Sequence, residues 1–181
     1  MKINGKKLKS IAESASLAPE QLAESLVPAG LGAGEALSAL RNWMAERNHP
    51  RARSGHIAAL AQALGVKPAD FCRYVSTTRF VRGSDRKVGL VTEMIRGMPV
   101  DRAMAALQFN PKRAAVSVRK TLMAAVADAE QAQADIAALV VAESRVDGGP
   151  LIKRFKAKDR GRAHQILKRT SHIIVGVEEK N

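Results

Sequence analysis

Residues 160–173 read RGRAHQILKRTSHI, and this stretch decides the fold. It runs into a segment in which Ile173, Val175 and Val177 alternate with other residues, which is the pattern of a β-strand. An earlier part of the chain has a similar character, because Leu139-Val140-Val141 is followed by the turn-forming run Val146-Asp147-Gly148-Gly149-Pro150. A strand, a basic irregular stretch and a returning strand predict one long β-hairpin over about residues 139–177.

The segment between the two arms carries more than half of the net charge of the chain. Residues 153–169 hold eight basic residues and one acidic residue, a net charge of +7, and the whole 181-residue chain has a net charge of +13. A merely solvated face usually mixes both signs, so this imbalance favours phosphate neutralisation. The predicted phosphate-binding cations are Lys153, Arg154, Lys156, Lys158, Arg160, Arg162, Lys168 and Arg169.

A second basic cluster surrounds the expected start of a helix. Arg79, Arg82, Arg86 and Lys87 flank Ser84, which we expect to cap that helix. Helix N-termini attract phosphate groups, so the cluster predicts contact with nucleic acid. Solvation of an ordinary surface is the alternative interpretation of these basic residues.

Composition excludes several other classes of protein. With 46% apolar residues the chain can bury a core, and a pI near 10.5 predicts a polyanionic partner, either nucleic acid or an anionic membrane. Aromatic residues make up 3% of the chain, too few for a platform that stacks single-stranded bases. The longest apolar stretch, residues 136–142, is too short to span a bilayer, and the lysine-rich N-terminus shows no secretory signal. We therefore expect a cytoplasmic protein without membrane contact.

No pattern in the sequence predicts catalysis or a cofactor. Cys72 is the one cysteine, so it forms neither an intramolecular disulfide nor a cysteine-based zinc site, and we expect it to be buried. The four histidines lack metal-ligand spacing. No serine–histidine–aspartate set, carboxylate pair or glycine-rich phosphate loop is recognisable. We expect no enzyme activity, cofactor, metal ion or small-molecule substrate.

Helical and strand patterns are mixed in residues 76–138. A strand is predicted over residues 77–82, and three helices follow it. They are expected to begin after a Ser84 cap, at Pro99, and at Asn110-Pro111, with the third helix running to about Ala134. Residues 76–181 are therefore predicted to form a domain that combines helices with strands.

The motifs of this second part resemble the universal large-subunit ribosomal protein L twenty-two family. The resemblance covers residues 76–179 and includes the long ungapped run quoted above. The other matching motifs are Arg79-Phe80-Val81-Arg82, Ser84-x-Arg86-Lys87-Val88, Ile95-Arg96-Gly97, Val146-Asp147-x-Gly149-Pro150 and Lys153-Arg154.

The resemblance implies an α+β fold, with three helices on a small antiparallel sheet and one long extended β-hairpin. It implies a structural, non-catalytic protein of the large ribosomal subunit that binds large-subunit ribosomal RNA, supports assembly and contacts neighbouring ribosomal proteins. The hairpin tip would line the peptide exit tunnel and meet the nascent peptide, and the tip is expected over Lys156, Ala157, Lys158, Asp159, Arg160, Gly161 and Arg162. The shared motif adds further expected RNA contacts, which are Thr170, Ser171 and His172.

Residues 1–75 are predicted to form a separate small all-α domain. Apolar residues recur at helical spacing in five short segments, with Pro19 in a first turn, Ser54 as a cap and Gly65 after the fourth helix. The last helix is expected to run from Pro68 to about Tyr74. The motifs Glu20-Gln21-Leu22-Ala23-Glu24 and Leu60-Ala61-Gln62-Ala63-Leu64-Gly65 resemble Cro/repressor-type helix-turn-helix domains.

The resemblance of this extension implies a third helix that faces DNA. Its possible nucleic-acid contacts are Ser38, Arg41, Asn42 and Arg47, and a solvated helix face is the alternative. Trp43 is expected in the core. For the whole chain, a ribosomal role is the leading hypothesis, and a DNA-binding transcriptional regulator that uses the N-terminal domain is the rival. Within the leading hypothesis, we expect the extension to attach to the outer surface of the ribosome through RNA or a neighbouring protein.

Overall fold

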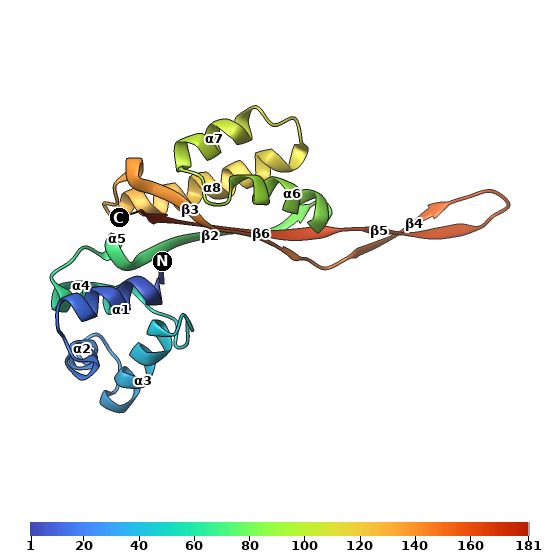
Figure 1. Cartoon of the computed structure of the whole chain (residues 1–181). Helices are drawn as coiled ribbons and strands as arrows, with labels where there is room; N and C mark the ends of the chain where they lie inside the picture. Colours follow the sequence, from blue (N-terminus) through green and yellow to red (C-terminus); the bar gives the residue numbers. More distant parts are fainter. Residues whose placement is uncertain (181) are drawn as a thin grey trace. The chain divides into compact units, whose positions relative to one another are not determined.

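A computed structural model describes residues 1–180 of the chain (Figure 1). The described chain divides into two compact units. The first unit is built from residues 1–74 and 128–134, and the second from residues 75–127 and 135–180.

Short helices make up most of the first unit. The elements of residues 1–71 are β1 (Lys2–Ile3), α1 (Gly5–Ser14), α2 (Pro19–Leu26), α3 (Ala33–Met44), α4 (Ser54–Leu64) and α5 (Pro68–Phe71). Pro19 lies at the first position of its helix, and Gly65 ends α4 with a left-handed φ of 66°, as the sequence predicted. The apolar faces of the helices form one core, which includes Leu8, Leu22, Leu26, Leu40, Trp43, Ile57, Leu60 and Phe71.

Trp43 lies in this core, which confirms the prediction for it. Its side chain is 1% exposed, and its indole N–H donates a hydrogen bond of 2.7 Å to the carbonyl oxygen of Pro50. The indole ring stacks on the buried imidazole of His56, with ring centroids 5.7 Å apart. Desolvation on burial, reinforced by the nearby charge of Arg53, lowers the pKa of His56. His56 is therefore a packing residue of this core.

Two boundaries of the first unit correct the sequence prediction. Ser54 is the first residue of α4 and not its cap, and the backbone N–H of Arg53 donates to Nδ1 of His56 at 3.3 Å. The last helix ends at Phe71, three residues before the expected Tyr74. The chain turns extended there because Cys72 and Arg73 pair with Ile3 and Lys2 of β1. Cys72 is fully buried, as predicted.

The second unit combines a sheet with three helices. Its elements are β2 (Cys72–Arg82), whose first residues belong to the first unit, α6 (Asp85–Ile95), α7 (Val100–Gln108), α8 (Arg113–Gln131), whose last residues belong to the first unit, η1 (Ile136–Ala138), β3 (Leu139–Gly148), β4 (Ile152–Ala157), β5 (Ala163–Lys168) and β6 (Thr170–Glu179). The four-stranded sheet has the order β1-β2-β6-β3, and its β3–β6 pair is antiparallel. Figure 1 shows α6, α7 and α8 gathered on one side of β3 and β6. The expected α+β fold, with three helices and an antiparallel sheet, is thus confirmed.

Helix and strand meet in a second core. β3 contributes Leu139 and Val141 to this core, and β6 is buried continuously from Ile173 to Val177. The helices cover them with residues at a spacing of three and four. The buried set includes Val88, Val91, Ile95, Ala103, Leu107, Val118, Leu122, Ala125, Leu139, Val141, Ile173, Val175 and Val177.

Helix starts in the second unit are less regular than predicted. Ser84 occupies the cap position of α6, but its hydroxyl donates to Oδ1 of Asp85 at 3.3 Å and accepts no bond from a helix amide. α8 begins at Arg113 and not directly after Asn110-Pro111, because the Asn110 side chain accepts from the Lys112 N–H at 3.0 Å and closes a turn first. α8 ends at Gln131, before the expected Ala134.

The predicted hairpin is present and has two parts. Its inner arms, β3 and β6, belong to the sheet, whereas β4 and β5 form a separate two-stranded ribbon beyond it (Figure 1). Between the pairs Gly148–Ser171 and Ile152–Lys168, the outgoing arm has three residues and the returning arm has two. The extra residue is a bulge, and Pro150 is suited to it because proline has no N–H to donate to a ladder.

Candidate nucleic-acid interface

The pairing register sorts the side chains of the outer ribbon onto two faces. Residues directly opposite each other in an antiparallel pair lie on the same face. One face carries Ile152, Arg154, Lys156, His164, Ile166 and Lys168. The other face carries Lys153, Phe155, Ala157, Ala163, Gln165 and Leu167. The first face therefore carries three cations and the second carries Lys153, in each case beside apolar side chains, and the ribbon has no core of its own.

The tip of the ribbon is a turn closed by two backbone hydrogen bonds. The N–H of Lys158 donates to the carbonyl of Arg162 at 2.7 Å, and the N–H of Arg162 donates to the carbonyl of Asp159 at 3.2 Å. Arg160 and Gly161 have left-handed φ angles of 52° and 67°. Glycine adopts this conformation with little strain, which explains Gly161 in the turn. Every residue from 156 to 162 is exposed.

The cations of the outer ribbon lack carboxylate partners. Lys153, Arg154, Lys156, Lys158, Arg160, Arg162 and Lys168 are exposed, and none of them forms an ion pair with another residue of 1–180. Arg169 differs, because its guanidinium lies 3.6 Å from the Asp85 carboxylate. An uncompensated row of cations on an exposed ribbon favours a polyanionic ligand along its length.

Two of the expected RNA contacts lie instead inside the base of the hairpin. Thr170 is 4% exposed and Ser171 is fully buried. The Thr170 hydroxyl donates to the carbonyl of Pro150 at 2.7 Å, and the Gly149 N–H donates to the carbonyl of Thr170 at 2.9 Å. The Thr170 hydroxyl therefore joins the two arms, and Ser171 lies opposite Gly148 in the ladder between them. RNA contact at Thr170 and Ser171 stays a prediction.

His172 is half-buried beside Phe80. Its Nδ1 accepts a hydrogen bond of 3.1 Å from the Phe80 N–H, so the neutral ring carries its proton on Nε2. The Phe80 ring meets the imidazole edge-on, with centroids 4.9 Å apart at 80°. Phe80 has a left-handed φ of 58° and a side chain that is 59% exposed. Sequence reasoning did not include Phe80 among the contacts, although an exposed aromatic ring between Arg79 and Arg82 is a signal that could have indicated it.

The second basic cluster lies where β2 passes into α6. Arg79, Arg82, Arg86 and Lys87 are all exposed. Arg82 and Lys87 also line a groove of about 830 Å³, where they meet Lys112 and Arg113 at the start of α8. These last two cations were missing from the prediction. In the sequence they are a basic pair at the start of a predicted helix. No local pattern indicates that this pair lies beside Arg82 and Lys87, which are about thirty positions earlier.

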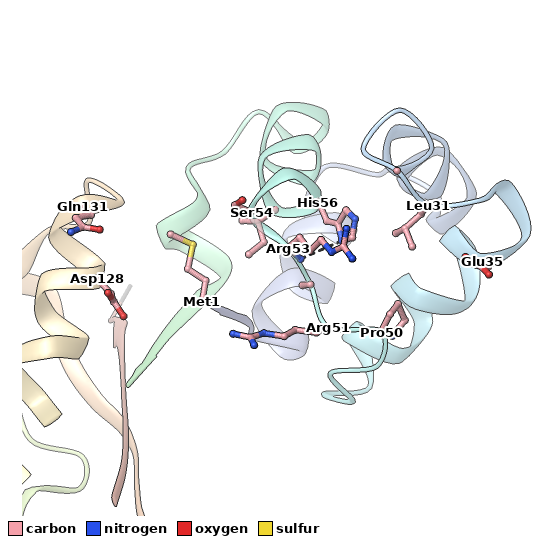
Figure 2. Close-up of a pocket in the computed structure, with 13 residues that line it drawn as sticks. Met1, Leu31, Glu35, Pro50, Arg51, Arg53, Ser54, His56, Asp128 and Gln131 are labelled. Carbon is pink, nitrogen blue, oxygen red and sulfur yellow. Dashed lines mark hydrogen bonds between the residues drawn. The ribbon is translucent and has the colours of Figure 1, made fainter. Parts of the chain in front are cut away.

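The candidate contacts of the extension lie on and after α3. Ser38 and Arg41 are exposed and Asn42 is half-buried, but the Ser38 hydroxyl already donates to the carbonyl of Glu35 at 2.8 Å. Arg47 lies beyond the end of α3 and is exposed. Figure 2 shows two further arginines, Arg51 and Arg53, near Pro50 on the segment that joins α3 to α4. Sequence reasoning did not select this pair.

No helix within residues 1–180 has the length and apolar character needed to cross a membrane. The same residues contain no group of three side chains of the metal-ligating types that could hold an ion.

Comparison with known proteins identifies the second part of the chain. The large ribosomal subunit protein uL22 of Magnetococcus marinus is 53% identical to it over 103 residues, which are 56% of this chain and 91% of that protein. The uL22 protein of Desulfitobacterium hafniense is also 53% identical over 103 residues, covering 56% of this chain and 90% of that protein. The family described as Ribosomal protein L22p/L17e matches residues 76–178, which leaves the helical extension outside the match. Because this match takes in more than half of the chain and nearly the full length of these relatives, the chain belongs to the ribosomal protein L22p/L17e family.

Proposed function

We propose that the chain is a structural component of the large ribosomal subunit that binds large-subunit ribosomal RNA through the outer ribbon and the β2–α6 cluster. The observation that carries the proposal is the row of exposed hairpin cations without carboxylate partners. Membership of the ribosomal family points to the large subunit as the assembly, and the positive charge of the ribbon points to RNA as the ligand within it. Phosphates positioned along the ribbon would neutralise these cations and order the ribbon.

The tip has the properties expected of a tunnel-lining segment. Residues 156–162 project from a ribbon that buries nothing, so they can follow the shape of surrounding RNA without disturbing the helices. The family resemblance implies that this tip meets the nascent peptide. Asp159 is the one carboxylate among the tip cations, and it would place a negative charge at that wall.

A salt titration tests the RNA-binding proposal. The full chain is bound to large-subunit ribosomal RNA transcribed in vitro, and the slope of log K against log salt is measured for two triple variants. Replacing Lys153, Lys156 and Lys168 by Gln should reduce the slope by about 2, because each lost contact to a single strand removes about 0.7. The matched control replaces Lys6, Lys67 and Lys120, which are exposed elsewhere in the chain. Equal slopes for the hairpin variant and the control would refute the proposal.

For the extension we propose attachment to the ribosome surface through RNA or a neighbouring protein, with specific DNA binding as the alternative. The exposed Arg41 and Arg47 favour the alternative, since arginine reads guanine edges. The first turn of α3 disfavours it, because Ala33 and Gly34 offer no side-chain donors and Glu35 repels phosphate. Selection of genomic DNA fragments by the full chain decides between them. A discrete sequence motif lost in the double variant Arg41→Gln, Arg47→Gln would establish the DNA-binding function.

A further inference from the structure

Three arginines of the helical extension gather in one segment, the connection between α3 and α4. Residues 45–53 carry Arg47, Arg51 and Arg53, all of them exposed, and Glu46 is the one acidic residue of this segment. A helix-turn-helix domain presents its second and third helices to DNA. In this extension, those two helices carry exposed acidic residues, which are Glu20, Glu24 and Glu35. The arginine-rich connection is therefore separate from the surface that such a domain applies to DNA.

The backbone of this connection is held by the core of the first unit. The carbonyl of Pro50 accepts a hydrogen bond of 2.7 Å from the indole N–H of the buried Trp43. The Arg53 N–H donates to Nδ1 of the buried His56 at 3.3 Å, and Ala52 is 6% exposed. The arginines are thus presented from a backbone that is already ordered, so a ligand that binds them pays little entropy for fixing the loop.

The guanidinium groups of the connection lack protein partners. None of Arg47, Arg51 and Arg53 forms an ion pair with another residue of 1–180. In Figure 2 the side chains of Arg51 and Arg53 do not point toward each other. The positive charge is therefore spread along the connection and does not converge on one point. A spread of this kind suits a polyanion with several phosphates better than a single small anion.

The extension has no exposed aromatic ring with which to bind an unpaired base. Its aromatic residues are Trp43, Phe71 and Tyr74, and all three are buried. Unpaired bases are usually bound by stacking on aromatic rings, whereas duplex RNA is bound through its phosphates and 2′-hydroxyls. The planar guanidinium of arginine binds phosphate through two parallel hydrogen bonds. The surface of the connection therefore suits the backbone of duplex RNA.

We propose that the connection between α3 and α4 docks the extension on a duplex segment of large-subunit ribosomal RNA, with phosphates bound by Arg51 and Arg53. The inference rests on the proposed function and deepens it, because it names RNA as the partner of the extension and the residues that bind it. These residues lie outside the region that matches the ribosomal family. An acidic segment of a neighbouring protein and DNA are the competing ligands.

The test uses tethered hydroxyl-radical cleavage in reconstituted large subunits that contain the full chain. The variant Ser54→Cys places a thiol on an exposed residue next to Arg53, and an iron chelate is attached to it. The natural Cys72 is buried, so the chelate attaches to the introduced thiol. Gln165→Cys, on the exposed outer ribbon, carries the reference probe. The probe at residue 54 should cleave a paired segment of the RNA that differs from the segment cleaved by the probe at residue 165.

Charge variants then test the arginines themselves. In the Ser54→Cys background, the double variant Arg51→Gln, Arg53→Gln should reduce cleavage of that segment at least about tenfold, the size expected for the loss of one hydrogen bond between charged groups. The matched control is Lys6→Gln, Lys67→Gln, which removes two exposed cations of the same unit and should leave cleavage unchanged. Cleavage by the probe at residue 165 should be the same in both variants.

Three results would overturn the inference. RNA cleavage from residue 165 but none from residue 54 would refute RNA docking of the extension and leave the proposed function of the hairpin intact; a protein cross-linked at residue 54, or DNA binding lost in the arginine variant, would then identify the ligand. Equal cleavage in the arginine variant and the control would show that Arg51 and Arg53 do not bind the RNA. Absence of cleavage from both probes would refute the proposed function together with the inference.

Discussion

The hydroxyl of Thr170 donates a hydrogen bond of 2.7 Å to the carbonyl oxygen of Pro150 across the base of the hairpin. This bond joins the two arms at the bulge, where the regular ladder between them is interrupted. Proline cannot donate to the ladder, and the threonine hydroxyl supplies the missing cross-connection. The inner sheet and the outer ribbon are therefore joined by side-chain and backbone bonds at one point.

Gly149 is required at this point because of its close approach to Thr170. A Cβ at residue 149 would lie 2.5 Å from the Thr170 hydroxyl oxygen and 3.0 Å from its carbonyl oxygen. We expect Gly149→Ala to destabilise the second unit by about 1–3 kcal/mol, the usual cost of overpacking. Urea unfolding measures it. Gly148→Ala is the control, since a Cβ there meets no atom within 4 Å, and equal stabilities of the two variants would contradict the account.

His172 supports a strained residue. The left-handed φ of Phe80 costs about 1–3 kcal/mol for a non-glycine residue, and the bond from its N–H to His172 helps to hold it. His172→Ala removes both this bond and the edge-on ring contact, and should lower stability by about 1–2 kcal/mol. His172→Asn retains an acceptor near the Nδ1 position and should lose less. Thermal unfolding measures both variants, and a loss for His172→Asn as large as that for His172→Ala would contradict a role for the hydrogen bond.

The Asp85 carboxylate should make the stability of the folded chain depend on pH in acid. The pKa of the Asp85 carboxyl is lowered, mainly by the hydrogen bond from the Arg86 backbone N–H. The hydrogen bond from the Ser84 hydroxyl and the charge of Arg169 lower it further. A carboxyl whose pKa is lower in the folded state contributes stability above its unfolded pKa and loses it as the pH falls through the folded pKa. Wild type should therefore exceed Asp85→Asn in stability at neutral pH, and the difference should shrink as the pH falls below the ordinary aspartate value of 3.8 and vanish below the lowered folded pKa. A difference that is constant with pH would contradict this.

We expect the Cys72 thiol to be unreactive in the folded protein. Burial raises the pKa of its thiol to about 12, so almost no reactive thiolate exists at pH 8. Labelling with an aromatic disulfide reagent should be slow without denaturant and should follow the unfolding curve in urea. Labelling at the rate of a free thiol in the native protein would show that β1 and β2 do not cover it.

Local patterns predicted the second unit well because its elements follow simple periodicities. The alternation around Ile173 and the cap position of Ser84 were both visible in the sequence. The pairing of Cys72 with Ile3 was not predicted, because the two residues lie about seventy positions apart and no local pattern indicates such a contact. Long-range pairing of this kind also brought His172 to Phe80.

The part of the candidate site that consists of clustered basic residues could be predicted from the sequence. The exposed ribbon cations, such as Lys156, follow from the run of basic residues in the sequence. Burial of Ser171 and Thr170 was not predictable from the motif, because whether a hydroxyl faces a ligand or the opposite arm depends on the position of the bulge. Lys112 was not predicted as a contact residue, because its cationic neighbours in the groove include Arg82 and Lys87, which lie far from it in the sequence.

The central claim is that this chain is a structural protein of the large ribosomal subunit, and sedimentation tests it most directly. Cell extract from the source organism is separated on a sucrose gradient at moderate salt, and the protein is located with an antibody against residues 1–75. The account predicts that most of it travels with the large subunit and is released as salt rises. Recovery of most of the protein at the top of the gradient, free of the large subunit, would contradict the account.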